Sequence, residues 1–302
     1  MQIAVTGALG HIGSKLIRSL PGHDLVLIDN FYAQRYCSLF NLPPHKFIEA
    51  DIETILQEDL DAIFKGVDVV IHLAAITDAQ SSNEHKGLVQ RVNVGGTLKV
   101  AKACQNTGAK LIFPSTTSVY GKCMGLEVVE DPLGFIPNLE PQSPYAISKL
   151  DSEYLLKGFY NLKYVILRLG TIFGTSTGMR FHTAVNKFCF QAAHGQPVTV
   201  WRTAMNQNRP YLDLDDAIAA IKFVIDNSVY NSEIYNVVTL NTTVATILEI
   251  IRERVPVNVN YVDSEIMNQL TYTVSNKKFC DLRFKFTGDI RRGINETLDL
   301  LK

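Results

Sequence analysis

A short glycine-rich turn near residue 10 constrains this chain more than any other feature. Glycines recur at a spacing of three between residues 7 and 13, directly after an apolar stretch at residues 2–6. An apolar helical pattern follows at residues 14–20, and a buried-strand pattern at residues 24–29 ends in Asp29. Strand, glycine turn, helix and strand form a βαβ unit, which binds the pyrophosphate of a dinucleotide at its turn. The segment therefore predicts a dinucleotide site.

The acid at the end of the second strand favours NAD over NADP. Asp29 lies 16 positions after Gly13, where a carboxylate accepts hydrogen bonds from the adenosine ribose and repels a 2′-phosphate. The alternative is a structural glycine turn followed by a surface or helix-capping Asp, because a glycine pattern by itself is weak evidence. The complete βαβ unit favours the dinucleotide.

Strand and helix patterns alternate through the first half of the chain, which predicts a parallel sheet with helices on both faces. The strand cores are almost continuously apolar, as expected for strands covered on both sides. The predicted fold is thus a doubly wound α/β sheet of the Rossmann type. The predicted strands are residues 2–6, 25–29, 46–51, 67–75, 110–114 and 164–169.

The second half has a looser pattern, which predicts a smaller mixed C-terminal lobe for the substrate. We expect an NAD-binding domain at residues 1–174 and a substrate-binding lobe at residues 175–302. Segments near 211–216 and 234–238 are expected to return to the first domain. The loop at residues 122–144 has no helical period and is predicted to cover a site. Helices are predicted near residues 180–194, 214–227 and 244–254.

Composition narrows the range of partners. The 302 residues carry a formal net charge of −1 without a basic run, so nothing indicates nucleic-acid binding. No leader pattern is present and the apolar runs are shorter than a membrane span, which predicts a cytoplasmic protein without a membrane partner. The five scattered cysteines form no metal-binding pattern, so we expect free thiols and no metal site: Cys37, Cys104, Cys123, Cys189 and Cys280.

A tyrosine and a lysine four residues apart are the first candidates for chemistry. Tyr145 and Lys149 lie in a helical pattern at a spacing that puts both on one face. A phenol is a poor base at neutral pH, and a neighbouring ammonium lowers its pKa by stabilising the anion. Upstream, hydroxyl residues at 115–118 follow a predicted strand, where parallel sheets bind ligands. One of these hydroxyls can hold a substrate alcohol or carbonyl beside the phenol and share its proton; the alternative for such a run is an ordinary turn.

Together these features resemble the extended short-chain dehydrogenase/reductase family of nucleotide-sugar epimerases and dehydratases. The resemblance extends over essentially the whole chain. It is carried by the glycine turn, by Asp29 and by segments at residues 51–52, 72–75, 93–97, 118–121, 145–149 and 209–213.

The resemblance implies a set of contacts with NAD. Residues 51–52 would contact adenine, residues 74–75 would line the cofactor, and Asn93 would support the central helix. Lys149 would also hold the nicotinamide ribose. The cofactor-binding residues predicted in this way are Gly7, Gly10, His11, Ile12, Gly13, Asp29, Asn30, Asp51, Ile52, Leu73, Ala74, Ala75, Asn93, Tyr145 and Lys149.

One departure from the family pattern narrows the activity. In the 4,6-dehydratases of this family, Asp and Glu follow the catalytic Thr and act as acid and base. Here Thr116 is followed by Thr117 and Ser118. Because a hydroxyl cannot replace a carboxylate as a base at neutral pH, dehydration is disfavoured. Epimerases and reductases remain compatible with the sequence.

The predicted substrate-binding residues differ from the family pattern at two places. Thr171 stands where many members have a substrate-holding Asn. Arg209 matches the diphosphate-binding Arg of the family, but residues 264–273 lack the second Arg that usually precedes the C-terminal segment. Arg180 and Arg202 are candidate replacements, since a guanidinium binds phosphate oxygens through paired hydrogen bonds. For each, a solvated surface Arg is the alternative.

Two aromatic side chains complete the predicted substrate site. By resemblance to the epimerase-reductases that make fucose-type sugars, His182 is a candidate proton donor, although Ser118 stands where its Cys partner is expected. Trp201 is a candidate stacking surface for a nucleotide base, with a core position as the alternative. The predicted substrate-binding residues are Thr117, Thr171, Arg180, His182, Trp201, Arg202 and Arg209.

These observations predict an NAD-dependent epimerase that acts on a nucleoside-diphosphate sugar through a transient 4-keto sugar. Its catalytic residues would be Thr116, Tyr145 and Lys149. The alternatives are an NAD(P)H-dependent 4-keto-sugar reductase or epimerase-reductase and, from a different class, a non-catalytic dinucleotide-binding module. Family analogy predicts a homodimer, formed through helices near residues 84–106 and 145–160.

Overall fold

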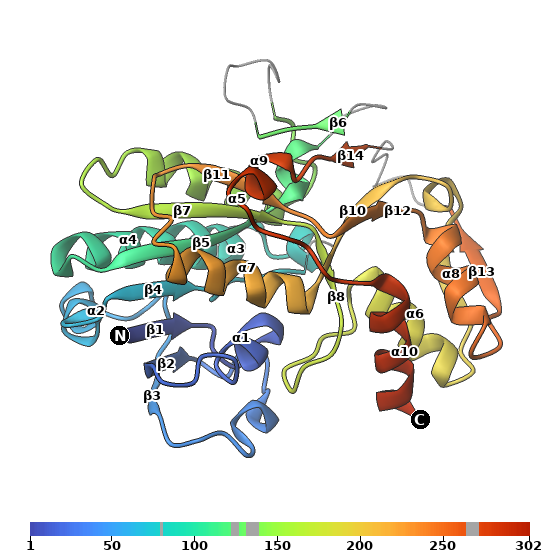
Figure 1. Ribbon diagram of the computed structural model, residues 1–302, viewed down its shortest axis with the longest axis horizontal. Coiled ribbons are helices and arrows are strands. Elements are labelled where there is room, and N and C mark those ends of the chain that lie inside the picture. The colour runs from blue at the N-terminus through green and yellow to red at the C-terminus, as the bar shows by residue number, and fades with distance from the viewer. Residues whose placement is uncertain (79–80, 122–126, 131–138, 264–271) are drawn as a thin grey trace.

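A seven-stranded parallel sheet forms the centre of the computed structural model, which describes residues 1–78, 81–121, 127–130, 139–263 and 272–302 (Figure 1). Its strands follow the spatial order β11–β7–β5–β4–β1–β2–β3. Every neighbouring pair in this order is parallel, so the predicted doubly wound sheet is confirmed. The strands are β1 Gln2–Thr6, β2 Asp24–Asp29, β3 Lys46–Glu49, β4 Val69–His72, β5 Lys110–Thr116, β7 Tyr164–Leu169 and β11 Ile234–Val237.

Helices cover both faces of this sheet. On one face α1 (His11–Leu16) and α7 (Leu214–Asp226) bury a large apolar cluster against the sheet. On the other face α2 (Gln57–Phe64), α4 (Gly96–Thr107) and α5 (Pro144–Lys157) bury a second cluster. Because the inner strands β1, β4, β5 and β7 are covered on both sides, their residues are apolar almost throughout, as the sequence predicts.

The order of the strands creates a crevice next to β1. The chain runs outward from β1 through β2 and β3, and then returns to place β4 on the other side of β1. Loops that follow β1 and β4 therefore diverge at the carboxyl ends of these strands, which is where doubly wound sheets bind ligands. The glycine turn at residues 7–13 and the segment at residues 73–77 border this crevice.

A smaller set of elements packs beside the large sheet. Helices α6, α8 and α10 gather at one end of the molecule together with the C-terminus (Figure 1). They share an apolar cluster with strands of the small sheets, which include the three-stranded sheet β12–β10–β8. The small strands are β6 Glu127–Val128, β8 Thr171–Phe173, β9 Val198–Trp201, β10 Arg209–Asp213, β12 Leu240–Thr242, β13 Val259–Val262 and β14 Thr273–Val274. The remaining helices are α3 Lys86–Val89, α6 Ala184–Ala193, α8 Val244–Arg252, α9 Lys277–Asp281 and α10 Ile290–Leu301.

Two segments of the second half behave differently from each other. Residues 234–237 form β11 and pair with β7, as an edge strand of the large sheet. Residues 209–213 form β10, which pairs with β8 and β12 in the small sheet instead of the large one. Of the segment near residues 211–216, the part that contacts the large sheet is the start of α7, whose apolar side packs against one face of that sheet. The domain limits near residue 174 stay a prediction.

The predicted strand at residues 67–75 is shorter in the structure. β4 ends at His72 because the chain then turns toward the glycine turn. The Leu73 nitrogen donates to the Thr6 carbonyl at 2.9 Å, and the Ala74 nitrogen to the Thr6 hydroxyl at 3.3 Å. These bonds bring the apolar residues after His72 to the crevice. Of the loop predicted to cover the site, residues 122–126 and 131–138 lie outside the described residues.

Candidate active site

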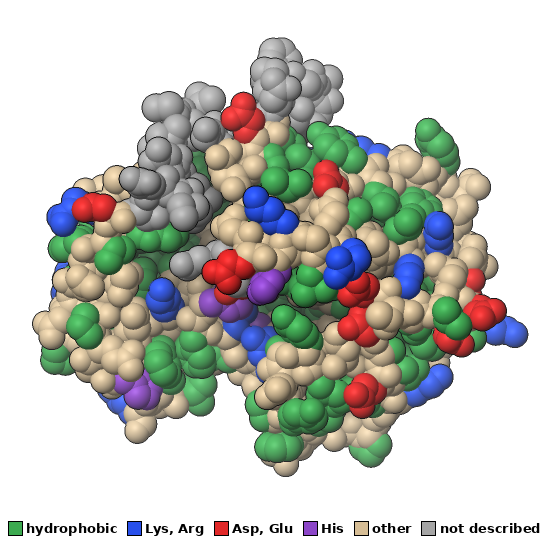
Figure 2. All heavy atoms as spheres, turned by 180° about the vertical axis from the view of Figure 1, so that it is seen from behind, with side chains coloured by type: hydrophobic (Ala, Val, Ile, Leu, Met, Phe, Trp, Pro, Cys, Tyr) green, Lys and Arg blue, Asp and Glu red, His purple; other side chains and the backbone are tan. Residues whose placement is uncertain are grey.

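A cavity of about 270 Å³ lies in the crevice at the carboxyl end of the large sheet. Most of the predicted cofactor-binding residues line it: Gly7, Gly10, His11, Ile12, Gly13, Asp29, Asn30, Asp51, Ile52, Leu73, Ala74 and Ala75. Asn93, Tyr145 and Lys149 do not belong to its wall. Figure 2 shows the opposite face of the molecule, where histidine and basic side chains gather around a central hollow.

The glycine turn packs so closely against neighbouring backbone that two of its positions have no room for a Cβ. Gly7 has a φ of 67°, and a Cβ at this position would lie 2.6 Å from the Ala74 nitrogen. A Cβ on Gly13 would lie 2.5 Å from the Gly7 oxygen. Both positions therefore require glycine. The bare backbone of the turn borders the cavity directly, which fits the close approach of a pyrophosphate.

Carboxylates at the far end of the cavity fit a ribose. Asp29 accepts hydrogen bonds from the Leu9 and Phe31 nitrogens, each at 3.0 Å. The Asn30 amide donates to Asp51 at 2.8 Å. Because a carboxylate can accept about four hydrogen bonds, Asp29 retains acceptor positions for ribose hydroxyls. The position of Asp29 fits the binding of NAD. The individual contacts of Asp29, Asn30 and Asp51 with the cofactor stay predictions.

Positive charge gathers on the same wall. Arg35 and Arg180 line the cavity, and both lower the pKa of His11, which burial already holds well below its usual value. The His11 Nδ1 atom lies 3.0 Å from the Ser176 hydroxyl, while its buried Nε2 has no partner in the described part of the protein. Two guanidinium groups and an unpaired ring nitrogen suit an anionic ligand such as a dinucleotide. The sequence analysis missed Arg35, although a cation six residues after Asp29 in the same loop could have indicated it.

Asn93 ties the loop after β4 to the helix of the predicted tyrosine. It lies in a π-helical segment, Gln90–Gly95, that leads into α4. Its side chain accepts from the Ile76 nitrogen at 2.8 Å and donates to the Ile76 carbonyl at 3.0 Å. The same amide donates to the Ser148 hydroxyl of α5 at 2.9 Å. Asn93 therefore fixes the position of α5 relative to the cavity wall.

The three predicted catalytic residues lie together at the end of β5. Tyr145 and Lys149 occupy the first two turns of α5, and the Lys149 Nζ donates to the Pro114 carbonyl of β5 at 2.8 Å, two residues before Thr116. Burial raises the pKa of Tyr145, whereas Arg180 and Thr116 lower it. Burial lowers the pKa of Lys149 to about 8, against the opposing effect of Glu153. The arrangement brings a hydroxyl, a phenol and an ammonium into one buried corner.

A buried ion pair between β7 and α5 lies next to the predicted catalytic residues. Arg168 of β7 and Glu153 of α5 lie 2.6 Å apart, both almost fully buried. The Ser115 hydroxyl donates to the same carboxylate at 2.5 Å. Ser115 directly precedes Thr116, so the pair fixes the end of β5 against α5. The sequence analysis missed this pair, because nothing in the local sequence links residues of a strand and a helix.

The predicted substrate residues are spread over a wider region. Thr117 is buried and its hydroxyl lies 3.4 Å from the Leu169 carbonyl, so it faces the backbone. Thr171 lies in β8, next to Tyr211 of β10. Arg209 donates to Gln207 at 2.7 Å and lies over the Tyr272 ring at 5.4 Å.

Of the other predicted substrate residues, one lines the cavity and three do not. Arg180 lines the cavity. His182, two residues after Arg180, keeps part of its surface exposed, and the partial burial of its ring together with Arg180 lowers its pKa to about 4. Trp201 ends the small strand β9, outside the cavity wall. Arg202 is exposed, lies 3.5 Å from Asp263 and stacks over Tyr261 at 5.1 Å. The cavity thus includes Arg180 but not Trp201 or Arg202.

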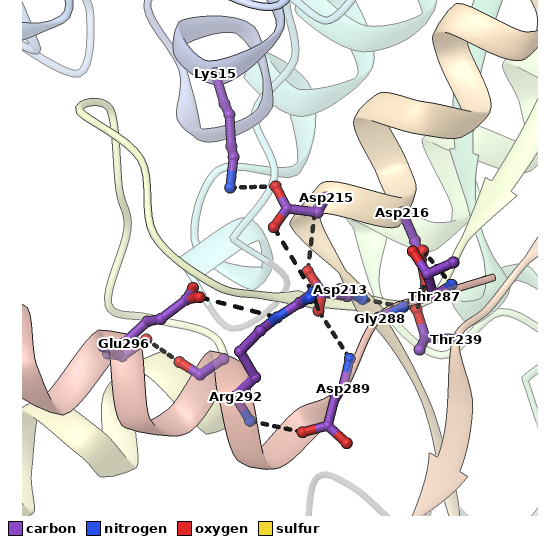
Figure 3. Close-up of polar contacts among 12 residues, drawn as sticks. Lys15, Asp213, Asp215, Asp216, Thr239, Thr287, Gly288, Asp289, Arg292 and Glu296 are labelled. Atoms are coloured by element: carbon purple, nitrogen blue, oxygen red, sulfur yellow. Dashed lines mark hydrogen bonds and ion pairs between the residues drawn. The ribbon is translucent and has the colours of Figure 1, made fainter.

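The motif at residues 209–213 leads into a polar cluster that joins distant parts of the chain (Figure 3). The Asp216 carboxylate accepts from the Thr287 and Gly288 nitrogens at 2.9 and 3.0 Å and from the Thr239 hydroxyl at 2.6 Å. Asp213 accepts from the Asp289 nitrogen at 3.1 Å and pairs with Arg292 at 2.9 Å. These aspartates therefore fix the segment before α10 to the start of α7.

The described residues contain no group of three or more His, Cys, Asp or Glu side chains that could hold a metal ion. Four cysteines are free thiols, and Cys123 lies outside the described residues. None of the helices in the described ranges is both long and apolar enough to cross a membrane.

A dinucleotide cavity at the carboxyl end of a parallel sheet, together with a tyrosine and a lysine one turn apart on α5, is typical of NAD-dependent enzymes of the doubly wound class. Residues 3–237 match the model of the NAD dependent epimerase/dehydratase family. The chain belongs to this family. The expected cofactor, NAD, and the expected enzyme class are thereby confirmed.

Two curated proteins illustrate the range of relatives. A Bacillus subtilis (strain 168) protein described as an uncharacterized UDP-glucose epimerase, YtcB, is 32% identical over 240 residues, which cover 74% of this chain and 72% of that protein. A trifunctional Arabidopsis thaliana enzyme, RHM1, described as a UDP-glucose 4,6-dehydratase, 3,5-epimerase and UDP-4-keto-L-rhamnose-reductase, is 27% identical across 99% of this chain. The match spans only 46% of that plant protein.

Solved structures resemble the whole chain. UDP-glucuronic acid 4-epimerase from Bacillus cereus, in complex with UDP-glucuronic acid and NAD, is 27% identical with a TM-score of 0.86 and covers 100% of this chain and 99% of its own. UDP-glucose 4-epimerase from Thermus thermophilus, in complex with NAD, is 25% identical with a TM-score of 0.84, at the same coverage of 100% and 99%.

Proposed function

We propose that this protein is an NAD-dependent 4-epimerase of a UDP-sugar. The observation that carries the proposal is that α5, with Tyr145 and Lys149, packs against the end of β5 just before Thr116, where the Lys149 Nζ donates to the Pro114 carbonyl at 2.8 Å. The same fold contains a cavity that fits a dinucleotide. The solved structures described as UDP-sugar 4-epimerases support the choice of carbon and of nucleotide, and the relative described as a UDP-glucose epimerase supports the nucleotide.

In the proposed reaction, Tyr145 acts as the base for the C4 hydroxyl. Its phenolate accepts the hydroxyl proton while the C4 hydrogen leaves with its electron pair, which gives a 4-keto sugar. NAD, when bound, supplies the acceptor and later the donor of that hydride. Tyr145 returns its proton to the oxygen after the sugar has presented its other face, so C4 is inverted. Thr116 holds the sugar oxygen next to the phenol, and Lys149 binds the nicotinamide ribose.

Dehydration is disfavoured by the residues that follow Thr116. A carboxylate pair would be needed at positions 117 and 118, where the chain has Thr117 and Ser118. The Thr117 side chain is buried and faces the Leu169 carbonyl. A hydroxyl in this environment cannot act as the acid and base of water elimination.

Arg209 is the proposed ligand of the substrate diphosphate. Burial lowers the pKa of its guanidinium from the usual range, which the neighbouring Tyr272 and Tyr211 partly oppose. A half-buried arginine over the Tyr272 ring is partly removed from water and gains from an anionic partner.

A panel of UDP-sugars and 4-keto nucleotide sugars tests the proposal. The protein is purified, its bound cofactor is released and identified, and each sugar is incubated with and without added NAD, NADH or NADPH. We expect retained NAD and a 4-epimerised product that forms without net consumption of cofactor. Stoichiometric oxidation of NADH or NADPH by a 4-keto sugar would establish the reductase instead. Cofactor binding without turnover of any sugar would establish the non-catalytic module.

We also propose a homodimer that uses α5 as part of its interface. Ile147 and Tyr154 expose 42% and 57% of their surface on this helix, which supports an apolar contact. Analytical ultracentrifugation tests it, and a monomer at all concentrations would refute it. A cytoplasmic location stays a prediction, which fractionation of the source cells would check.

A further inference from the structure

The loop between β8 and α6 is bonded to the glycine turn on one border of the crevice. The Ser176 hydroxyl donates to the His11 carbonyl at 2.9 Å, and the Gly178 nitrogen donates to the Ser14 hydroxyl at 2.9 Å. A Cβ on Gly178 would lie 2.3 Å from a carbonyl oxygen of the turn, so no side chain fits between the two backbones. In Figure 1 the loop runs from β8 toward α1. Residues 176–180, which we call the strap, therefore rest directly on the turn.

The strap reaches the other border of the crevice through Arg180. The Arg180 Nη1 atom donates at 2.6 Å to the hydroxyl of Thr77, a residue of the segment after β4. The Arg180 carbonyl accepts from the Asn186 side chain of α6 at 3.2 Å, which fixes the backbone at this end of the strap. Arg180, His11 and Thr77 all line the cavity. A single segment is thus bonded to both borders of the crevice that contains the cavity.

A third contact joins the strap to the loop that follows β2. The Cys37 thiol donates to the Thr177 carbonyl at 3.2 Å. Cys37 lies two residues after Arg35, which lines the cavity. The strap is therefore held by the segments that follow three strands of the large sheet, β1, β2 and β4.

Two buried polar atoms at the ends of the strap have no hydrogen-bond partner within the described residues. They are the Nε2 atom of His11, whose Nδ1 lies 3.0 Å from the Ser176 hydroxyl, and the Nε atom of Arg180. A buried polar atom without a partner costs free energy, which a ligand can offset by supplying the partner. Because both residues line the cavity, these atoms indicate a polar ligand that is bound while the strap is in place.

We propose that the strap must open for the dinucleotide cofactor to enter or leave the cavity, and that the hydrogen bond from Arg180 to Thr77 is its closing contact. A segment that closes a site slows the entry and the release of its ligand together. The inference rests on NAD binding and not on the proposed epimerisation. Slow exchange suits a 4-epimerase, because that reaction returns the cofactor to its starting state in every turnover.

The exchange of NADH tests the strap in the absence of any sugar. Thr77→Val removes the closing hydrogen bond at nearly the same side-chain shape, and Ser176→Ala removes the bond from the strap to the glycine turn. Thr177→Ala is the matched control within the strap, since its side chain is exposed and only its carbonyl makes the contact described above. Stopped-flow fluorescence gives the association rate constant on mixing cofactor-stripped protein with NADH. Displacement of bound NADH by excess NAD gives the dissociation rate constant.

We expect both rate constants to rise about fivefold in Thr77→Val and in Ser176→Ala, the usual effect of one lost hydrogen bond, while Kd changes by less than about twofold. Thr177→Ala should keep the rate constants of the wild type. A residue that merely contacts the cofactor would change the dissociation rate constant alone and raise Kd, and that result would overturn the proposal. Unchanged rate constants in both variants would also overturn it. Neither result bears on the proposed epimerisation, which the panel of sugars tests separately.

Discussion

The cofactor cavity and the substrate lobe are built in opposite ways. The cavity is made mostly of short segments that follow consecutive strands, with the turn at residues 7–13, Asp29, residues 51–52 and residues 73–75 each at a strand end. The lobe is assembled from segments far apart in the chain, such as the contacts of Asp216 with residues 287–288. The first region depends on backbone shape, and the second depends on long-range side-chain contacts.

This difference explains how the two regions respond to substitution. In the cavity, a changed side chain alters a ligand contact and leaves the strand ends in place. In the lobe, a lost contact separates segments that are distant in the chain. The following predictions test this contrast, from the largest expected effect to the smallest.

Replacement of the proposed base should have the largest effect. Tyr145→Phe removes the phenol hydroxyl, so kcat should fall by about 10³-fold, the usual contribution of a positioned acid or base. NAD affinity should stay unchanged, because Tyr145 does not line the cavity. Steady-state kinetics and NADH fluorescence titration measure both. Tyr160→Phe is the control, since Tyr160 is 95% exposed; equal activity of the two variants would remove Tyr145 as the base.

Loss of the lobe contacts should lower stability most. Asp216→Ala removes a buried carboxylate that accepts three hydrogen bonds, from the Thr239 hydroxyl and the Thr287 and Gly288 nitrogens, so the free energy of unfolding should fall by about 4 kcal/mol. Urea unfolding measures this loss. The adjacent Asp215→Ala breaks partly exposed ion pairs with Lys15 and Arg292 and should cost less than about 1 kcal/mol. Similar losses for both aspartates would contradict the buried role of Asp216.

The charge on Lys149 should make stability depend on pH. Burial lowers the pKa of Lys149 from 10.5 to about 8, so the folded protein binds this proton less tightly than the unfolded chain. The stability of the wild type relative to Lys149→Met should therefore rise between about pH 8 and pH 10.5, by about 3 kcal/mol in total. Urea unfolding across this range measures the difference. Lys157→Met, on the exposed end of α5, should show no such rise; a falling difference for Lys149→Met would refute the buried charge.

Replacement of Asp29 should have a smaller effect, on the preference for NADH over NADPH. Asp29→Asn keeps an acceptor for one backbone nitrogen and removes the negative charge, so NADH affinity should fall about tenfold while NADPH affinity rises. Fluorescence titration with each cofactor measures the change. Asp24→Asn, at the exposed start of the same strand, should leave both affinities as they are. An unchanged ratio of the two affinities in Asp29→Asn would separate Asp29 from cofactor choice.

The sequence predicts the large sheet and its cofactor side well, because the information is local. Apolar runs specify buried strands, and the turn at residues 7–13 needs glycine for reasons of close contact. The pairing of Arg168 with Glu153 is not local, since a strand and a helix meet there only after folding. The position of Arg180 cannot be predicted from the sequence for the same reason. The sequence indicates a cation in the substrate lobe. The loop that carries Arg180 contacts the glycine turn through Ser176, and this contact brings Arg180 to the cavity.

The pairing of β11 with β7 has a consequence for how the chain folds. The two strands are neighbours in the sheet, yet residues 170–233 lie between them in the chain. The edge of the sheet can therefore close only after this long excursion has been completed, and such non-local pairing slows folding. We expect an early species that exposes the edge of β7, so newly made chains should aggregate more readily than the finished protein.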